Sequence, residues 1–383
     1  MRIAVVRGAN LNAWELSNFH LPGHEVVAIG SRRGAFDAHG VPVGQVRLRS
    51  PADVVARLPF PLPAVVARFG GEVSWLFGLE RALRGFDVAH VAELSSPYSL
   101  QALRARDAGA VGCVVATVWE NIALAPVANA LVARRVAEVA AGVDRFLAVT
   151  ERAREHLRYA GVEDDRIEVL PMGVDVERFA PVERGASDEL RVLCVSRLVP
   201  EKGVEDLVVA LGMLVARGVP ASVTFAGEGP ARARLEQLAA AGGVSDRVRF
   251  AGLVPYEAMP SLHASADVFV LASAPRATWQ EQFGFAVVEA MASGLPVLAG
   301  DSGSLDEVVG DRAQLVVPHK PDRLADALEA LAADPERRRR LGEANRARTV
   351  ERYDRRRVAV ALEAFYERSL STASRRAPIT RQS

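Results

Sequence analysis

Short apolar runs alternate with amphipathic segments along most of the chain, and this alternation is typical of parallel β–α units. Strands are expected in the first half at residues 3–6, 25–29, 45–48, 87–92, 111–117, 145–149 and 167–170. A second series is expected at residues 191–196, 222–226, 248–251, 268–272, 296–299 and 314–317. The chain is therefore expected to have an α/β fold with two parallel sheets.

The stretch between the two series, residues 177–189, loses apolar periodicity and gains charge together with Pro181 and Gly185. We expect an N-terminal domain at 1–176, a linker at 177–189 and a C-terminal domain at 190–354. A last helix at 355–370 is a candidate for crossing back to the first domain, and the polar tail 371–383 is expected to be disordered. Two Rossmann-like, doubly wound domains would face a central cleft at the carboxyl ends of their strands.

Composition and charge narrow the function classes. Lys plus Arg equals Asp plus Glu, 47 each, so no global positive field attracts nucleic acid. Cys113 and Cys194 fall inside expected buried strands, where reduced core thiols are the preferred interpretation over a disulfide or a metal site. The first strand follows Met1 and Arg2 directly, and the apolar stretch 111–133 is interrupted by polar residues. We expect a cytoplasmic protein, and peripheral contact with the inner face of a membrane stays open.

Two glutamates, Glu281 and Glu289, flank the start of an expected helix at residues 285–292, which Gly294 and Pro296 end. The first carboxylate would lie in the loop at the helix N-terminus, and the second would project from about one turn into the helix. Backbone N–H groups at a helix start favour an anion. Two acceptors beside an anion site suit a ligand that carries both phosphate and hydroxyl groups, as a sugar nucleotide does.

Two cations, Arg197 and Lys202, occupy the loop that follows the strand ending at Ser196. Arg can bind a phosphate through two hydrogen bonds, and Lys acts as a mobile point charge. The alternative is that both are solvated loop charges, paired with Glu201 or Glu205. The glutamate pair at another strand end of the same domain favours the phosphate interpretation. The cations also argue against a two-carboxylate glycosidase.

Glycines follow two further strands. Gly227 opens a Gly-Glu-Gly turn, which either approaches a phosphate or simply allows a tight turn. Arg7-Gly8-Ala9-Asn10 follows the first strand without the dinucleotide fingerprint, which argues against a nicotinamide or flavin dehydrogenase.

The run from Arg191 to about Tyr366 resembles the donor-binding half of retaining glycosyltransferases of the GT-B fold, family 4 (glycosyl transferases group 1). The resemblance rests on the Ser196-Arg197 to Lys202-Gly203 loop, on Phe225-Ala-Gly227-Glu-Gly229-Pro and Arg249-Phe-Ala-Gly252, on Ala266-Asp267 to Ser273, on Glu281-Gln-Phe-Gly284 to Glu289, and on Ser302-Gly303 to Glu307. The first half resembles the family less tightly, through Phe86-Asp-Val-Ala-His90 and Leu170-Pro171-Met-Gly173.

The resemblance implies that Arg197 and Lys202 hold a donor diphosphate, that Glu289 accepts from ribose hydroxyls and that Glu281 accepts from sugar hydroxyls. Protein cations at the leaving diphosphate would replace a metal ion, so no cofactor and no metal are expected. The residues expected to contact the donor are Gly8, Asn10, Ser196, Gly227, Gln282, Phe283, Gly284, Phe285 and Glu289.

The first domain departs from the family pattern. The family often carries a His after the strand at 111–117, whereas this chain has Trp119-Glu120-Asn121. Glu120 or Asn121 is the candidate replacement as a contact to the donor sugar or the acceptor, and Glu120 is the candidate catalytic residue. A cap for the following helix or a surface carboxylate is the alternative. His90 lies in an apolar strand and is expected to be a core residue. Glu93, just past that strand, is a candidate for lining the cleft.

Together these features predict a retaining hexosyltransferase of glycan biosynthesis. It would move a sugar from a UDP- or GDP-sugar to a hydroxyl of a saccharide, lipid-linked or small-molecule acceptor. A GT-B sugar-nucleotide 2-epimerase and a non-catalytic sugar-nucleotide-binding protein are the alternatives. Trp279, two residues before Glu281, would cover the sugar or pack the loop.

Overall fold

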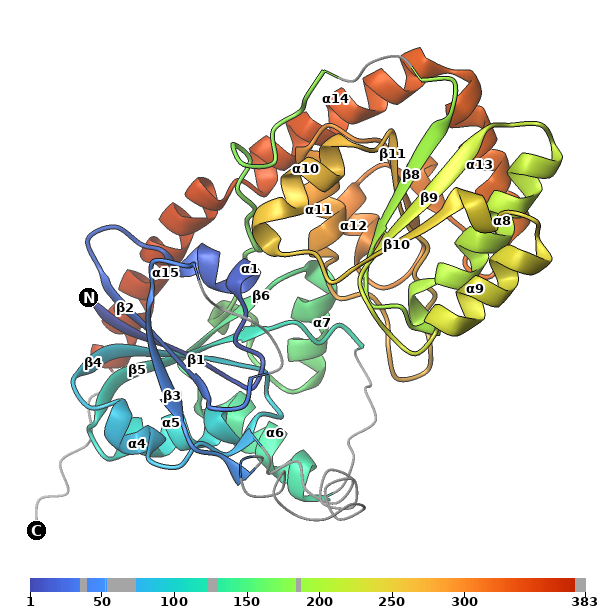
Figure 1. The fold of residues 1–383 in the computed structure, drawn as a ribbon. Coiled ribbons are helices and arrows are strands. Elements are labelled where there is room, and N and C mark those ends of the chain that lie inside the picture. Colours follow the sequence, from blue (N-terminus) through green and yellow to red (C-terminus); the bar gives the residue numbers. More distant parts are fainter. Residues whose placement is uncertain (35–39, 52, 54–73, 123–129, 184–186, 376–383) are drawn as a thin grey trace, which may run out of the picture. The chain divides into compact units, whose positions relative to one another are not determined.

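The computed structural model describes residues 1–34, 40–51, 53, 74–122, 130–183 and 187–375. The chain forms two compact units. The first contains Met1–Met172 and Arg355–Ser383, and the second contains Gly173–Asp354. Each unit has one parallel sheet with helices on both faces (Figure 1). The expected α/β fold with two Rossmann-like domains is confirmed.

The first unit contains a seven-stranded sheet in the order β3-β2-β1-β4-β5-β6-β7. Its strands are β1 (Arg2–Gly8), β2 (Glu25–Ser31), β3 (Gly44–Leu48), β4 (Phe86–Ala92), β5 (Val111–Val118), β6 (Arg145–Ala148) and β7 (Ile167–Val169). Its helices are α1 (Ala13–Leu16), η1 (Ser17–Phe19), α4 (Leu79–Ala82), α5 (Pro97–Asp107), α6 (Ala130–Gly142), α7 (Glu151–Tyr159), η3 (Asp164–Arg166) and α15 (Arg355–Arg375).

The second unit contains a six-stranded sheet in the order β10-β9-β8-β11-β12-β13. Its strands are β8 (Leu190–Val195), β9 (Ala221–Ala226), β10 (Val248–Gly252), β11 (Val268–Leu271), β12 (Val297–Gly300) and β13 (Leu315–Val316). Its helices are η4 (Pro200–Lys202), α8 (Val204–Ala216), α9 (Arg232–Ala241), η5 (Ser245–Arg247), η6 (Tyr256–Ala258), α10 (Met259–Ala264), α11 (Phe285–Ala292), α12 (Leu305–Val309), η7 (Arg312–Gln314), α13 (Pro321–Ala333) and α14 (Pro335–Arg352).

Both faces of the second sheet are covered, which explains why its strands are nearly continuous apolar runs. One core is formed by α8, α9 and α13 against the sheet. The other is formed by α11 and α12 against β8, β11 and β12. In Figure 1, α8, α9 and α13 lie on one side of this sheet and α10, α11 and α12 on the other.

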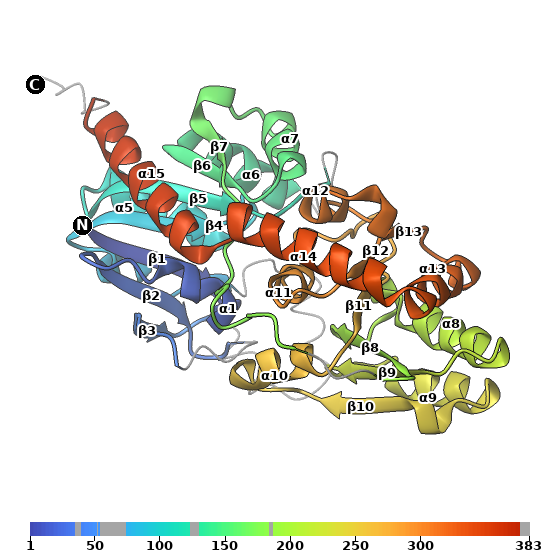
Figure 2. The ribbon, with the colours of Figure 1, turned by 90° about the horizontal axis from the view of Figure 1, so that it is seen from above.

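The last helix belongs to the first unit. α15 contacts β4 and β5, and its residues Leu362, Phe365 and Tyr366 join the core built on β1 (Figure 2). The expectation of a disordered tail from residue 371 is wrong for residues 371–375, because the helix continues to Arg375. Ser371 and Thr372 donate their hydroxyls to carbonyls four residues earlier, so these polar side chains are satisfied within the helix.

Two smaller expectations concern the cysteines and the membrane. Cys113 and Cys194 are free and buried, as expected for core thiols. Burial raises the pKa of Cys194 to about 11, which keeps the thiol protonated. Among the helices in the described part of the chain, none is both long and apolar enough to span a bilayer.

Candidate donor site

The second sheet reverses its strand order between β8 and β11, which are hydrogen-bonded neighbours. In doubly wound folds, ligands bind beyond the carboxyl ends of the strands at such a reversal, because the loops on either side of it diverge. The loop after β8 carries Ser196, Arg197 and Lys202, and the loop after β11 carries Glu281. The strand order therefore brings the predicted cations and the first glutamate to one place.

The two loops approach each other closely. Gly203 has φ +64°, and a Cβ there would lie 1.9 Å from the carbonyl oxygen of Ala272. A second link is the hydrogen bond of 2.9 Å from the Ala274 N–H to the Glu201 carbonyl. Only glycine permits this approach, and it places Lys202 directly beside the loop that follows β11.

Lys202 forms an ion pair with Glu281. Its Nζ lies 2.7 Å from Glu281 Oε2, and both side chains are mostly buried. The same carboxylate oxygen accepts a hydrogen bond of 2.8 Å from the buried hydroxyl of Ser273. The Lys202 Nζ also lies over the ring of Trp279, 4.9 Å from its centroid. One cation is thus fixed by a carboxylate and an aromatic face.

The motif around Ser302 and Gly303 holds the backbone of Glu281. The Ser304 N–H donates to the Glu281 carbonyl at 2.9 Å, and the Glu281 N–H lies 3.4 Å from Ser302 Oγ. A Cβ on Gly303, which has φ +57°, would lie 2.0 Å from the Glu281 carbonyl oxygen. These contacts fix the position from which the Glu281 side chain projects.

Helix α11 begins directly after this loop, as predicted. Gly284 adopts a left-handed conformation with φ +81° at its start. Phe283 is buried and packs edge-on against Phe285 and Tyr353, while Gln282 is exposed. The positive end of the helix dipole therefore lies beside the Lys202–Glu281 pair. Whether these backbone groups contact a donor stays a prediction.

Glu289 has different surroundings from Glu281. It lies in α11, is 5% exposed, and interacts with Tyr256 by a side-chain hydrogen bond. His263 Nε2 is 4.0 Å from its Oε2. Burial raises the pKa of Glu289 to about 8, although the Tyr256 hydroxyl and the Arg178 charge act in the opposite direction. The two glutamates are thus not equivalent acceptors, because Glu281 faces a cation and Glu289 is largely desolvated.

Arg197 and Ser196 lie in the same loop as Lys202. The Arg197 side chain is 62% exposed and its Nη2 is 3.8 Å from Glu201, a weak surface pair. Ser196 is partly buried and donates its hydroxyl to the Arg197 carbonyl at 3.1 Å. Of the two predicted cations, Lys202 is therefore the one held in a defined position by its neighbours.

Gly227 is explained by close packing between neighbouring strand ends. A Cβ there would lie 1.9 Å from the Ser196 carbonyl oxygen, and one on Gly229 would lie 2.3 Å from that of Leu198. Because neither position has room for a side chain, these contacts match the interpretation that Gly227 and Gly229 allow a tight turn. A role in approaching a phosphate stays a prediction.

In the first unit, the predicted residues follow β1. Gly8 has φ +54°, and a Cβ there would lie 2.9 Å from Cε1 of Tyr98. Asn10 is exposed, and its carbonyl accepts from the Asn12 side chain at 2.8 Å. Next to them lies a buried ion pair that the sequence did not reveal, with Arg7 Nε 2.6 Å from Glu15 Oε1.

Two carboxylates follow β4 and β5. Glu93 has φ +63°, which is rare outside glycine, and accepts the Trp119 N–H at 2.8 Å. Burial raises its pKa to about 7, and the nearby Glu120 charge acts in the same direction. Glu120 Oε1 itself accepts the N–H groups of Asn121 and Ile122, both at 2.9 Å. The segment that Glu120 would cap lies outside the described residues from position 123, so both the capping alternative and a catalytic role for Glu120 stay predictions.

His90 is a core residue, as expected. It is fully buried, with Nδ1 2.6 Å from the Tyr366 hydroxyl and Nε2 2.6 Å from Thr117 Oγ1. Burial holds the pKa of His90 well below its usual range. The ring therefore joins α15 to the sheet as a neutral hydrogen-bonding group.

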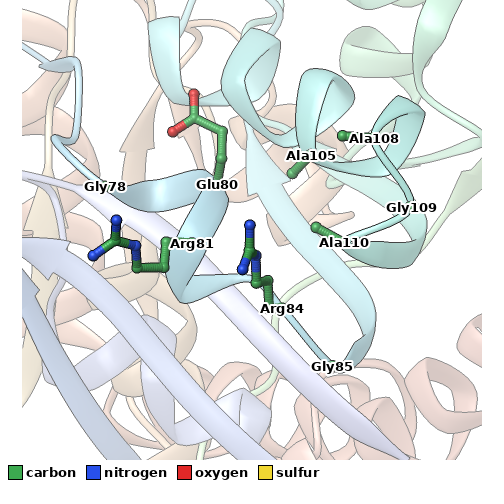
Figure 3. Close-up of a pocket in the computed structure, with 9 residues that line it drawn as sticks. All are labelled: Gly78, Glu80, Arg81, Arg84, Gly85, Ala105, Ala108, Gly109 and Ala110. Atoms are coloured by element: carbon green, nitrogen blue, oxygen red, sulfur yellow. The ribbon is translucent and has the colours of Figure 1, made fainter.

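A separate cavity of about 700 Å³ lies at the opposite, amino-terminal end of β4 and β5. Figure 3 shows Arg81 and Arg84 on one side of it, and Ala105 of α5 and Ala108, which follows that helix, on the other. None of the residues predicted to contact the donor, all of which lie in the described part of the chain, lines this cavity. We therefore do not place the donor in this cavity.

Sequence reasoning missed the side chains that surround the predicted ones. Tyr256, His263 and Arg178 lie in no motif, and Ser273 ends one without being singled out as a site residue. Each reaches a site glutamate through contacts or charge effects that depend on the fold. The sequence signal for Ser273 is its place at the end of that motif, just after β11.

Two family models match the chain. The model described as "Glycosyl transferases group 1" matches residues 175–348, and "Glycosyltransferase Family 4" matches residues 14–178. The two matches meet near the boundary between the two units.

Similar proteins with known activities are glycosyltransferases. The GDP-mannose-dependent alpha-(1-6)-phosphatidylinositol monomannoside mannosyltransferase of Mycobacterium tuberculosis is 36% identical over 268 residues, which cover 66% of this chain and 68% of that protein. The D-inositol 3-phosphate glycosyltransferase of Nocardia farcinica is 37% identical over 232 residues, which cover 55% of this chain and 50% of that protein. A solved structure of Anabaena Alr3699/HepE in complex with UDP has a TM-score of 0.72 at 18% identity. The match covers 96% of this chain and 99% of that one. The chain therefore belongs to the family 4 glycosyltransferases (glycosyl transferases group 1), enzymes of the GT-B fold that use nucleotide sugars.

Proposed function

We propose that this enzyme transfers a hexosyl group from a GDP- or UDP-sugar to an acceptor hydroxyl, with retention of anomeric configuration and without a metal ion. The observation that carries the proposal is the Lys202–Glu281 pair, 2.7 Å apart, at the strand-order reversal and beside the start of α11. A cation, a carboxylate and a helix N-terminus in one place match a ligand with a diphosphate and a sugar.

The chemistry follows from the charges. When the bond between the sugar carbon and the diphosphate oxygen breaks, its electron pair stays on the diphosphate and positive charge develops on the sugar. Lys202, Arg197 and the dipole of α11 would stabilise the diphosphate charge more in the transition state than in the ground state. Glu281 would accept hydrogen bonds from sugar hydroxyls, and Glu289 from those of the ribose. Because protein cations neutralise the leaving group, we infer that no divalent ion is required.

The relatives suggest which substrates to test first. The mycobacterial relative is named for GDP-mannose and phosphatidylinositol monomannoside, and the Nocardia relative for inositol 3-phosphate. We propose GDP-mannose as the first donor and a polyol or glycan hydroxyl, free or lipid-linked, as the acceptor. A lipid-linked acceptor would bring the enzyme to the inner face of a membrane. Retention of configuration is inferred from the family alone.

The test is incubation with GDP-mannose and with UDP-glucose, with and without myo-inositol, inositol 3-phosphate or phosphatidylinositol monomannoside vesicles. Proton NMR of the product would give the anomeric configuration, and a parallel reaction in EDTA would test the metal. An α-linked product from the α-configured donor, formed equally in EDTA, is expected. An epimerised sugar nucleotide without acceptor would instead favour a 2-epimerase, and binding without turnover would favour a non-catalytic protein.

Variants test the assigned site. Glu289→Ala and Arg197→Ala should both weaken nucleotide-sugar binding in calorimetry while the melting temperature shows a folded protein. Glu281→Gln should weaken GDP-mannose binding more than GDP binding, because GDP lacks the sugar and loses only the hold of Glu281 on Lys202. Wild-type donor affinity in both Glu289→Ala and Arg197→Ala would contradict the site.

A further inference from the structure

Trp279 is an aromatic residue of the second unit that contacts Lys202 directly. Its sequence position offered two roles, covering the sugar or packing the loop. In the structure its ring faces the ammonium group of Lys202, with Nζ 4.9 Å from the ring centroid. The geometry is that of a cation–π interaction, in which the negative ring face attracts a cation.

The position of Trp279 is set by a tight turn. The Arg276 N–H donates to the Trp279 carbonyl at 2.7 Å, and the Trp279 N–H lies 3.3 Å from the Arg276 carbonyl oxygen. The turn lies between Ala274, which is bonded to Glu201, and Glu281, which binds Lys202. The loop after β11 is thus tied to the Lys202 segment on both sides of Trp279.

The contact has a specific effect on the lysine. A lysine side chain has a flexible four-carbon stem and normally loses conformational freedom when it binds a phosphate. Here Glu281 holds the ammonium group from one direction and the indole face from another, and the Lys202 side chain is only 13% exposed. An ammonium group has three N–H donors, so the pair with Glu281 leaves donors for a phosphate oxygen.

We propose that Trp279 is a positioning residue of the donor site, which holds the Lys202 ammonium group in place for the diphosphate of the nucleotide sugar. This inference rests on the proposed function, because it requires Lys202 to contact the diphosphate. Trp279 acts through Lys202, so its removal weakens nucleoside diphosphate binding even when no sugar is attached. Covering the sugar alone would weaken only sugar-nucleotide binding.

The test is a double-mutant cycle measured by calorimetry with GDP and with UDP. Trp279→Leu keeps apolar volume but removes the ring face, Trp279→Phe keeps a weaker ring face, and Lys202→Met removes the charge but keeps the stem. Trp279→Leu is expected to weaken binding of the preferred diphosphate about 2- to 30-fold, the range of a cation–π contact. Trp279→Phe should lose less. In the Lys202→Met background, Trp279→Leu should cause no further loss.

Each outcome is decisive. Wild-type diphosphate affinity in Trp279→Leu, or the same fold loss with and without Lys202, would overturn the positioning role. Unchanged affinity in Lys202→Met would overturn the assignment of Lys202 to the diphosphate, and with it both proposals. The loss of the inference alone is therefore distinguishable from the loss of the proposed function. Melting temperatures of all variants would show that they are folded.

Discussion

The backbone of Gly203 lies so close to the carbonyl group of Ala272 that no residue with a Cβ atom fits at position 203. A Cβ on Gly203 would lie 1.9 Å from the Ala272 carbonyl oxygen, and the Gly203 backbone has φ +64°. This approach between the loop after β8 and the end of β11 is what brings Lys202 to Glu281, from which it is separated by 79 positions in the sequence. The donor site thus depends on a backbone contact.

Gly203→Ala should therefore damage both stability and donor binding. A left-handed Ala costs about 1–2 kcal/mol on its own, and the clash with backbone adds to it because a carbonyl cannot rotate away. Gly218→Ala is the matched control, since Gly218 also has positive φ, +80°, but no atom within 4 Å of its added Cβ. Urea denaturation and GDP calorimetry should show a larger loss of unfolding free energy for Gly203→Ala and a loss of GDP binding only there. Equal losses would contradict the role of the close approach.

Donor binding should depend on pH through Glu289. Burial raises its pKa in the free protein to about 8, and its neighbours are Tyr256, His263 and Arg178. If ribose hydroxyls donate to the ionised carboxylate, binding requires loss of the proton. GDP affinity should then rise between about pH 6 and pH 8, by no more than about tenfold per pH unit, and level off above pH 8.

Glu289→Gln is the control for this pH dependence, because glutamine does not titrate and has nearly the same shape. Its GDP affinity should be weaker at pH 8.5 and nearly flat across the range. The measurement is calorimetry in buffers matched for ionic strength. An equally steep rise in Glu289→Gln would assign the titration to another group.

The His90–Tyr366 hydrogen bond should contribute to stability and not to donor binding. Removing the hydroxyl in Tyr366→Phe leaves a buried His90 nitrogen without its partner, which costs about 1–3 kcal/mol. The pKa of His90 is lowered in the folded protein, so the unfolded chain binds the proton first as the pH falls. Stability should therefore be lost as the pH falls below the unfolded value near 6.5. His90→Asn should reduce this acid dependence in denaturant titrations, with GDP affinity unchanged.

The fold could be predicted because strands buried on both faces of a parallel sheet are apolar throughout. Each expected strand is present, with ends that differ by no more than two residues, for example 268–272 against Val268–Leu271. The α11 boundaries follow equally from periodicity and from Gly294. The end of α15 could not be predicted, because Ser371 and Thr372 are polar like tail residues although their hydroxyls are satisfied inside the helix.

The site could be predicted only as a set of residues, and not as a set of contacts. Motifs located Lys202, Glu281 and Glu289, but their partners depend on strand order, which apolar patterns do not encode. The pairing of Lys202 with Glu281 requires β8 and β11 to be neighbours. The burial of Glu289 depends on Tyr256 and His263, which come from segments with no motif.

Glu93 should show a trade-off between stability and acceptor use. Its φ of +63° is held by hydrogen bonds from its N–H to the Thr117 carbonyl and from Ser99 to its own carbonyl, and burial raises its pKa to about 7. Glu93→Gly relieves the strained backbone, by about 1–2 kcal/mol, and removes the buried carboxylate, but it also removes the acceptor of the Trp119 N–H, so the net gain should be smaller than that figure. Glu93→Gln keeps an oxygen for this N–H and relieves only the charge. If Glu93 lines the cleft and its carboxylate accepts from the acceptor hydroxyl, both variants should lose transfer to acceptor while their GDP affinity stays that of the wild type. Denaturation, calorimetry and turnover on one panel of proteins would check this, and full transfer activity in Glu93→Gly would assign Glu93 a purely structural role.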